Sequence, residues 1–174
     1  MNDPGIALSL DEEDRAASIR GGKVLTFTLG KEEYGITITK IREIIGMMPI
    51  TKVPRTSVFV KGVINLRGKV IPVIDLRIRF GIEEMEYTDR TCIVIVEVVS
   101  KNGTVQMGII VDSVSEVLNI QEGDVEAAPD LGAGDSTRYI MGMAKIGESV
   151  KILIDIDRVL GDKAIGEVER AAAS

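Results

Sequence analysis

Residues 62–81 have the sequence GVINLRGKVIPVIDLRIRFG, and a related stretch follows without a gap 80 positions later, at 142–161. Apolar residues stand in both copies at several further positions, such as Val63 and Met143. Self-similarity at a fixed offset indicates a duplicated structural unit. The identical pairs are Gly62 and Gly142, Val70 and Val150, Ile74 and Ile154, Asp75 and Asp155, and Gly81 and Gly161.

A second match extends the repeat upstream. Residues 35–45 lie over 108–118 at an offset of 73, with Glu43 matched to Glu116. The repeat therefore predicts two units, at about 23–81 and about 91–161, between tails at 1–22 and 162–174. Each unit is too small to bury a large core alone, so we expect the pair to form one body, and small closed barrels would leave no exposed strand edges.

The local pattern is that of short strands. Leu25, Phe27 and Leu29 alternate with smaller or more polar residues, as in a half-buried strand. Gly68 favours a hairpin turn between apolar runs, and Asp75 and Asp155 are suited to cap short helices. Hairpins are predicted over 63–74, 92–111 and 141–156. Short helices are predicted over 39–45, 75–80, 113–118 and 155–160, and Gly81 and Gly161 are suited to end the second and the fourth of these. The fold class is mostly β.

Composition excludes several kinds of chemistry. The 174 residues include no His and one Cys, so the chain has no Ser-His or Cys-His nucleophile and no internal disulfide. We expect Cys92, within an apolar run, to be a buried and unreactive thiol. Several Asp and Glu residues stand close together in the sequence, but none of these groups has the oxygen-ligand loop that calcium needs. We interpret these acids as solvent-exposed residues and helix caps. No metal, cofactor or enzymatic activity is predicted.

Charge is unevenly distributed along the chain. Residues 52–79 hold seven bases and one acid, whereas residues 80–174 hold eight bases and eighteen acids. The basic strip could steer an acidic partner, or its charges could only solvate the outer faces of strands. Few aromatic residues accompany the strip, so nucleic acid is not expected as a partner. The start of the chain lacks a signal-peptide pattern and no apolar run is long enough for a bilayer, so we expect a cytoplasmic protein.

Two sets of apolar residues stand at helical spacing. Plain core packing explains either set, but the two could also line a shared groove for a partner helix. Arg67, at a predicted hairpin tip, is unsuited to a core and suited to recognition of a carboxylate. The sets are Ile38, Ile41, Ile44 and Ile45, and Val111, Val114, Val117 and Leu118.

Several segments resemble one known family. They are FTLG at 27–30, EYGI at 33–36, KIREI at 40–44, VKGVINLRG at 60–68, IPVIDL at 71–76 and GIIVDSVSEVL at 108–118. From about Val24 to Leu160, the chain is similar to the CheW family of bacterial chemotaxis coupling proteins. The resemblance implies two small intertwined five-stranded β-barrels of SH3/OB-like type with a few short helices, in one domain at 23–161 with interleaved units.

The resemblance also implies a function. It implies a non-enzymatic adaptor that couples the cytoplasmic tips of methyl-accepting chemoreceptors to the regulatory domain of the histidine kinase CheA in membrane-bound arrays. An alternative is an adaptor that acts with a phosphorylatable receiver domain, although the sequence lacks the alternating βα pattern of a receiver. By the same resemblance, receptor-binding residues are Leu25, Ile38, Ile41, Glu43, Ile44, Arg67 and Val114, and kinase-binding residues are Asn65, Leu66 and Gly68.

Overall fold

The computed structural model describes residues 22–100, 103–127 and 139–160. In these residues the chain is mostly β, as predicted, and its few helices are short. The helical segments are η1 (Ile38–Lys40), α3 (Leu76–Arg79), η2 (Glu122–Asp124) and a turn of helix at 156–160. The strands are β1 (Lys23–Leu29), β2 (Glu32–Thr37), β3 (Ile41–Gly46), β4 (Val60–Leu66), β5 (Lys69–Asp75), β6 (Cys92–Ser100), β7 (Gly103–Val111), β8 (Ser113–Asn119), β9 (Val125–Glu126), β10 (Ile140–Ile146) and β11 (Ser149–Ile154).

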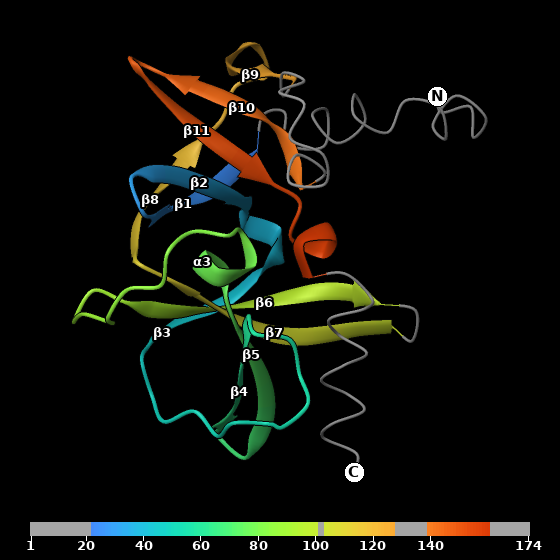
Figure 1. Cartoon of the computed structure of the whole chain (residues 1–174). Helices are drawn as coiled ribbons and strands as arrows, with labels where there is room; N and C mark the ends of the chain where they lie inside the picture. Colours follow the sequence, from blue (N-terminus) through green and yellow to red (C-terminus); the bar gives the residue numbers. More distant parts are fainter. Residues whose placement is uncertain (1–21, 101–102, 128–138, 161–174) are drawn as a thin grey trace.

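The strands form two sheets, one above the other in Figure 1. Sheet A has the order β8-β1-β2-β11-β10-β9, and sheet B has the order β3-β6-β7-β5-β4. The first hairpin of each repeated unit lies in the other unit's sheet: β1 and β2 join sheet A, while β6 and β7 join sheet B. Parallel pairs of β2 with β11 and of β7 with β5 complete this exchange.

The chain links the two edges of each sheet. In sheet B, Thr51 follows edge strand β3 and pairs with Val63 of the opposite edge strand, β4, through hydrogen bonds of 2.8 and 2.9 Å. In sheet A, the chain runs from edge strand β8 to the two-residue strand β9, which pairs with β10. The five-stranded barrels expected from the resemblance are thus present as two curled sheets, and sheet A has the short β9 as a sixth strand.

Two of the predicted helices are wrong. The segments 39–45 and 113–118 are mainly the strands β3 and β8. Each strand contains a β-bulge, in which Arg42 or Ser115 is the extra residue. A bulge returns residues three apart to the same face of a strand, so Ile41 and Ile44 share a face although their spacing is helical.

The predicted turns and helix caps are largely confirmed. The Asp75 carboxylate accepts hydrogen bonds from the amides of Arg77 and Ile78, and Asp155 does the same for residues 157 and 158. Gly81 ends α3 with a φ of 73°, and Gly68 turns the β4–β5 hairpin with a φ of 87°. Gly161 and the expected turn of the 92–111 hairpin at 101–102 lie outside the described residues.

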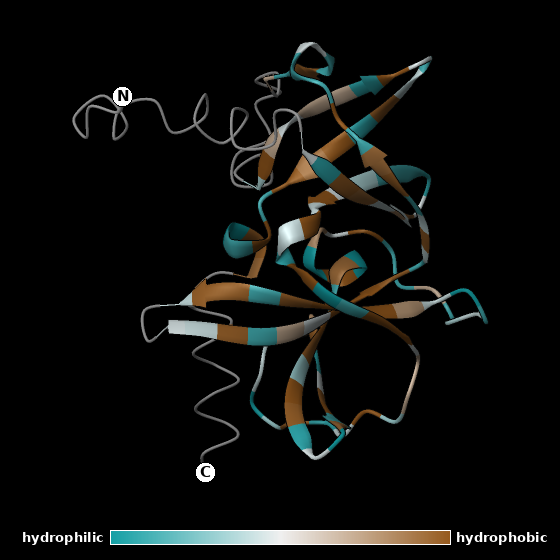
Figure 2. Ribbon diagram, turned by 180° about the vertical axis from the view of Figure 1, so that it is seen from behind, coloured by the Kyte–Doolittle hydropathy of each residue, from teal (hydrophilic) through white to brown (hydrophobic). Residues whose placement is uncertain are grey.

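Three apolar clusters hold the molecule together. A cluster of six buried residues, including Ile64, fills sheet B, and one of four, including Leu153, fills sheet A. The largest has seventeen buried residues, among them Phe27 and Val96, and lies where the two sheets meet; we call it the junction core. Figure 2 shows the hydrophobic colouring of the strands around it. Since burial of apolar area is the main stabilising term, the two sheets form one folding unit.

Candidate functional site

Five of the predicted receptor-binding residues lie at the junction core. Leu25 is part of it and is only 2% exposed, so its side chain lies beneath the surface. Ile38, Ile41 and Val114 are half-buried and pack against it from outside. Ile44 is 45% exposed, and its strand partner Val94 belongs to the junction core.

One further apolar residue at the same place belonged to the predicted groove sets but not to the receptor-binding residues that the resemblance implied. Val117 is 51% exposed, and its strand partner is the buried Leu25. Val117 is also the repeat counterpart of Ile44 and stood with it in the predicted groove sets. We call Ile38, Ile41, Ile44, Val114 and Val117 the junction seam.

The polar residues of the predicted site form a second group. The Arg67 guanidinium makes a two-pronged ion pair with the Glu43 carboxylate, and the Arg67 side chain is 69% exposed. The hydrogen bond to Glu43 raises the pKa of Arg67 above its ordinary value. The pair joins β3 to the tip of the β4–β5 hairpin, so the structure brings together two residues 24 positions apart.

The predicted kinase-binding residues lie at the same hairpin tip. The Asn65 side-chain oxygen accepts a hydrogen bond of 2.8 Å from the Gly68 amide, which fixes the turn. Leu66 is half-buried and packs against the apolar cluster of sheet B. We call Glu43, Asn65, Leu66, Arg67 and Gly68 the hairpin-tip group.

The bulge in β3 separates the two groups. Ile41 and Ile44 pair with Val96 and Val94, whose side chains are in the junction core. Glu43 instead pairs with Ile95, which belongs to the cluster inside sheet B. Since strand partners point to the same face, Glu43 faces away from the junction seam. The predicted receptor site is thus two adjoining surfaces on opposite faces of one strand.

A cavity of about 540 Å³ lies beside Val114. Its other lining residues are largely polar, and they include Arg90 and the half-buried Cys92. Burial raises the pKa of the Cys92 thiol, although a backbone hydrogen bond with Val114 opposes this. The thiol therefore has little nucleophilic character at neutral pH.

The basic strip is not one surface. Lys61 pairs with Glu84 at 2.8 Å, and the buried Arg77 pairs with Asp112 at 2.7 Å. Arg67 pairs with Glu43, while Arg79 lies over aromatic rings at the junction. The other bases of the strip, Lys52, Arg55 and Lys69, are exposed. The strip is therefore mostly divided among local partners.

The described ranges contain no group of three or more Cys, Asp or Glu side chains that could hold a metal ion. Among the same residues, no helix is both long and apolar enough to cross a membrane.

Comparison with known proteins gives matches over most of the chain. The model of the CheW-like domain family matches residues 23–164. The chemotaxis protein CheW of Klebsiella aerogenes is 38% identical over 154 residues, which is 88% of this chain and 90% of the relative. The chemotaxis protein CheW of Bacillus subtilis is 35% identical over 140 residues, 80% of this chain and 87% of the relative.

A solved structure also matches. The crystal structure of the scaffolding protein TtCheW from Thermoanaerobacter tengcongensis superposes with a TM-score of 0.73 and is 37% identical. The match covers 83% of this chain and 95% of that chain. The exchanged hairpins and the two sheets therefore lie within the part of the chain that is shared with these relatives.

Proposed function

Since the chain belongs to the family of CheW-like domains, which are non-enzymatic scaffolding proteins, we propose that it couples chemoreceptors to the histidine kinase CheA. In this proposal it acts in the cytoplasm and binds two proteins at once: the cytoplasmic tip of a transmembrane chemoreceptor and the regulatory domain of the kinase. The functional unit is the domain at 23–161.

We place the receptor at the junction seam. The observation that carries this assignment is that Ile44 and Val117 are largely exposed although both stand beside the junction core. Exposed apolar residues beside half-buried ones can bind the apolar face of a partner helix, whose apolar side chains recur at regular spacing. Leu25 supports the seam from beneath and would not be a direct contact while buried.

The hairpin-tip group adds a polar surface on the other face of β3, adjoining the seam. Arg67 and Glu43 satisfy each other in the free protein, and both stay accessible to a charged side chain of a partner. A partner that offers a carboxylate to Arg67 would exchange one ion pair for another, which gives specificity more than affinity. Asn65, Leu66 and Gly68 are assigned to the kinase contact, next to the receptor contact.

A binding experiment tests the proposal. A receptor signalling fragment and the kinase are mixed with this protein, and the ternary complex is recovered through a tag on the receptor fragment. We expect Ile44→Glu and Val117→Glu to remove the receptor from the complex while leaving kinase binding intact, because a charge at the seam cannot enter an apolar contact. The matched control is Val99→Glu, which changes an equally exposed valine on β6.

Either of two results contradicts the proposal. The first is the absence of any ternary complex with the unchanged protein. The second is equal loss of receptor binding with Val99→Glu, since this would mean that the seam is not the site. Circular dichroism of each variant shows whether the fold is kept.

A further inference from the structure

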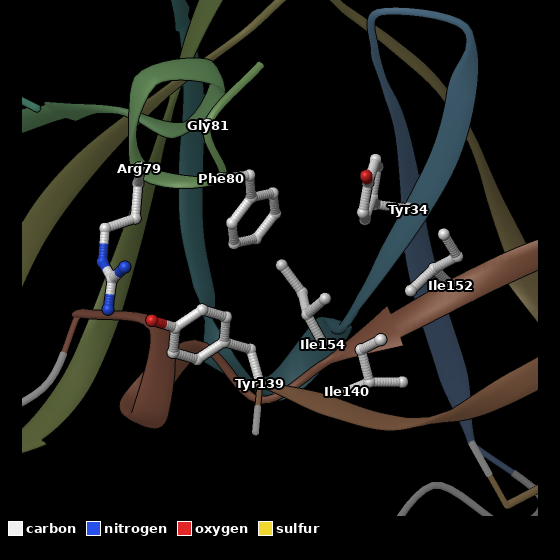
Figure 3. Close-up of a pocket in the computed structure, with 8 residues that line it drawn as sticks. All are labelled: Tyr34, Arg79, Phe80, Gly81, Tyr139, Ile140, Ile152 and Ile154. Carbon is white, nitrogen blue, oxygen red and sulfur yellow. The ribbon is translucent and has the colours of Figure 1, made fainter. Parts of the chain in front are cut away.

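A second cavity lies at the junction, apart from the seam and from the hairpin tip. Its volume is about 400 Å³, and it is lined by Tyr34, Phe80, Tyr139 and the isoleucines of β10 and β11. Figure 3 shows these side chains around the space between sheet A and the end of α3. Cavities of this size with apolar and aromatic walls are typical of small-molecule sites.

The chain concentrates its aromatic residues here. Of its six aromatic residues, four form a continuous row, in which successive ring centroids are 6.0, 5.5 and 5.9 Å apart. A fifth, Phe59, lies 5.2 Å from the guanidinium of Arg79. The row is Phe27, Tyr34, Phe80 and Tyr139.

Arg79 supplies a positive charge at the rim. Its guanidinium lies 4.5 Å from the centroid of Tyr139, and its Nε donates a hydrogen bond of 2.9 Å to the carbonyl of Val159. No carboxylate among the described residues forms an ion pair with it, unlike Arg67 and Arg77. Figure 3 shows the guanidinium beside the Tyr139 hydroxyl at one side of the cavity. Its remaining N–H groups can therefore serve an anion.

Arg79 has no counterpart in the second unit, where Val159 occupies the equivalent position. Phe59 and Tyr139 are repeat counterparts of each other, and their carbonyls accept equivalent hydrogen bonds from the amides of Asp75 and Asp155. The duplicated plan therefore places one arginine between two matching aromatic residues. This asymmetry gives the cavity a cation that the repeat alone would not provide.

We propose that this cavity binds a small anionic amphipathic molecule, with a flat or branched apolar body among Tyr34, Phe80 and Ile152 and a carboxylate or similar anion on Arg79. The apolar body would be bound by burial, and the anion by charge-assisted hydrogen bonds from a guanidinium that the rings hold in place. A bound molecule would touch both sheet A and α3, and so would stabilise the junction from the side of the cavity.

The test uses 2-naphthoate and its neutral counterpart 2-naphthamide with the whole chain, labelled at the isoleucine δ1 methyl groups. We expect naphthoate to shift the methyl resonances of Ile140, Ile152 and Ile154 in a saturable way, and to leave those of Ile64 and Ile93 unchanged. The affinity for naphthamide should be lower by a factor of roughly ten or more, since a hydrogen bond to a charged group contributes about 1.5 kcal/mol or more.

Two variants decide between charge recognition and unspecific apolar binding. Arg79→Gln should weaken naphthoate to the level of naphthamide, and the exposed Arg90→Gln is the matched control. Ile152→Trp should fill the cavity and prevent binding of both probes. The proposal is wrong if millimolar naphthoate leaves the three methyl groups unshifted, or if both probes bind equally in the unchanged protein and in Arg79→Gln. Circular dichroism and the unshifted methyl spectrum report whether each variant is folded.

Discussion

Arg67 has a left-handed backbone conformation, with a φ of 53°, at the position where the second unit has Gly147, with a φ of 60°. Glycine adopts this conformation without steric cost, and an arginine does not. The two hairpin tips therefore share a turn but differ in the residue that it presents. The steric cost of a positive φ at Arg67 is consistent with a role of this side chain in contacts, since the turn itself would favour glycine.

Replacement of Arg67 by glycine should separate folding from binding. Because the φ suits glycine, we expect Arg67→Gly to unfold at the same urea concentration as the unchanged protein or at a slightly higher one. Arg67→Glu should leave the fold intact but place a second carboxylate beside Glu43. Both variants should weaken receptor capture in the assay described above. A clear loss of stability in Arg67→Gly would mean that the guanidinium holds the hairpin.

Tyr87 lies in the connector between the two units and ties it to the first. Its hydroxyl donates a hydrogen bond of 2.9 Å to the carboxylate of Asp75, which is 1% exposed. Arg77 holds the same connector through the carbonyl of Glu83 and the sulfur of Met85. This network was not predictable from the sequence, because nothing in the local pattern of 82–91 pairs it with Asp75.

Loss of the Tyr87 hydroxyl should be visible in both stability and its pH dependence. Burial, with the charge of Asp75, raises the pKa of Tyr87 above its ordinary 10.0. The folded state then holds this proton more tightly than the unfolded state, so its contribution is complete below pH 10 and is lost as the pH rises further. We expect Tyr87→Phe to lose about 1–2 kcal/mol at pH 8 in urea unfolding, because a charged acceptor loses a donor.

The same measurement at higher pH provides the check. Above pH 10, the stability of the unchanged protein should fall more steeply than that of Tyr87→Phe. Parallel pH profiles of the two proteins would contradict the assigned hydrogen bond.

At the scale of elements, the bulges repeat with the rest of the plan. Arg42 and Ser115 are the extra residues of β3 and β8, and Lys61 and Met141 are those of β4 and β10. Each pair is related by the offset of the sequence repeat, 73 or 80 residues. Bulges curve strands, so the repeated bulges fit the curl of both sheets.

The bulges also explain what could be predicted from sequence. The hairpins, caps and mostly β character were predictable because turn residues and alternation act locally. The segments at 39–45 and 113–118 were mistaken for helices because a bulge produces helical spacing within a strand. The grouping of Ile41 with Ile44 was nevertheless correct. The separation of Glu43 from that face was not predictable, since it depends on strand partners far along the chain.

Closure of sheet B depends on a glycine, and this gives a third prediction. A Cβ on Gly62 would overlap the carbonyl oxygen of Thr51, and the φ of Gly62 is 144°, which is unfavourable for other residues. We expect Gly62→Ala to cost about 3 kcal/mol or more in urea unfolding, because the edge pairing must open. Gly68→Ala has an unfavourable φ but open space, and should cost only about 1 kcal/mol.

Gly142 is the repeat counterpart of Gly62, and we expect the stability cost of Gly142→Ala to lie between the costs of Gly62→Ala and Gly68→Ala. A Cβ on Gly142 would lie 2.9 Å from the carbonyl oxygen of Glu126, so the backbone of β9 must shift, but the overlap is smaller than at Gly62 and the φ of Gly142 is not positive. Equal costs for Gly62→Ala and Gly68→Ala would show that the Thr51 pairing adds nothing to stability.

At the scale of the whole molecule, the exchanged hairpins make each sheet dependent on both units. Sheet A needs β1 and β2 at its centre, and sheet B needs β6 and β7. The junction core likewise combines Phe27 and Leu76 of the first unit with Val96 and Ile156 of the second. Neither unit therefore contains the strands of a complete sheet.

A chain divided at the connector should fold only by reassociation. We expect fragments 1–88 and 89–174, prepared separately, to lack a cooperative thermal transition, because each would leave sheet edges and junction residues uncovered. Mixed or co-expressed, they should give a one-to-one complex with the circular dichroism spectrum of the whole chain. Cooperative unfolding of fragment 1–88 alone would contradict the dependence of each sheet on both units.

The exchange also bears on how such a protein could have arisen by gene duplication. A half-length ancestor with one unit could not have placed its own first hairpin beside its remaining strands in the present arrangement. In that arrangement, two copies of one unit would trade hairpins as a homodimer. Fusion of two such copies would turn an interface between molecules into one within a single polypeptide and would let the halves differ, as Arg67 and Gly147 do at the two hairpin tips.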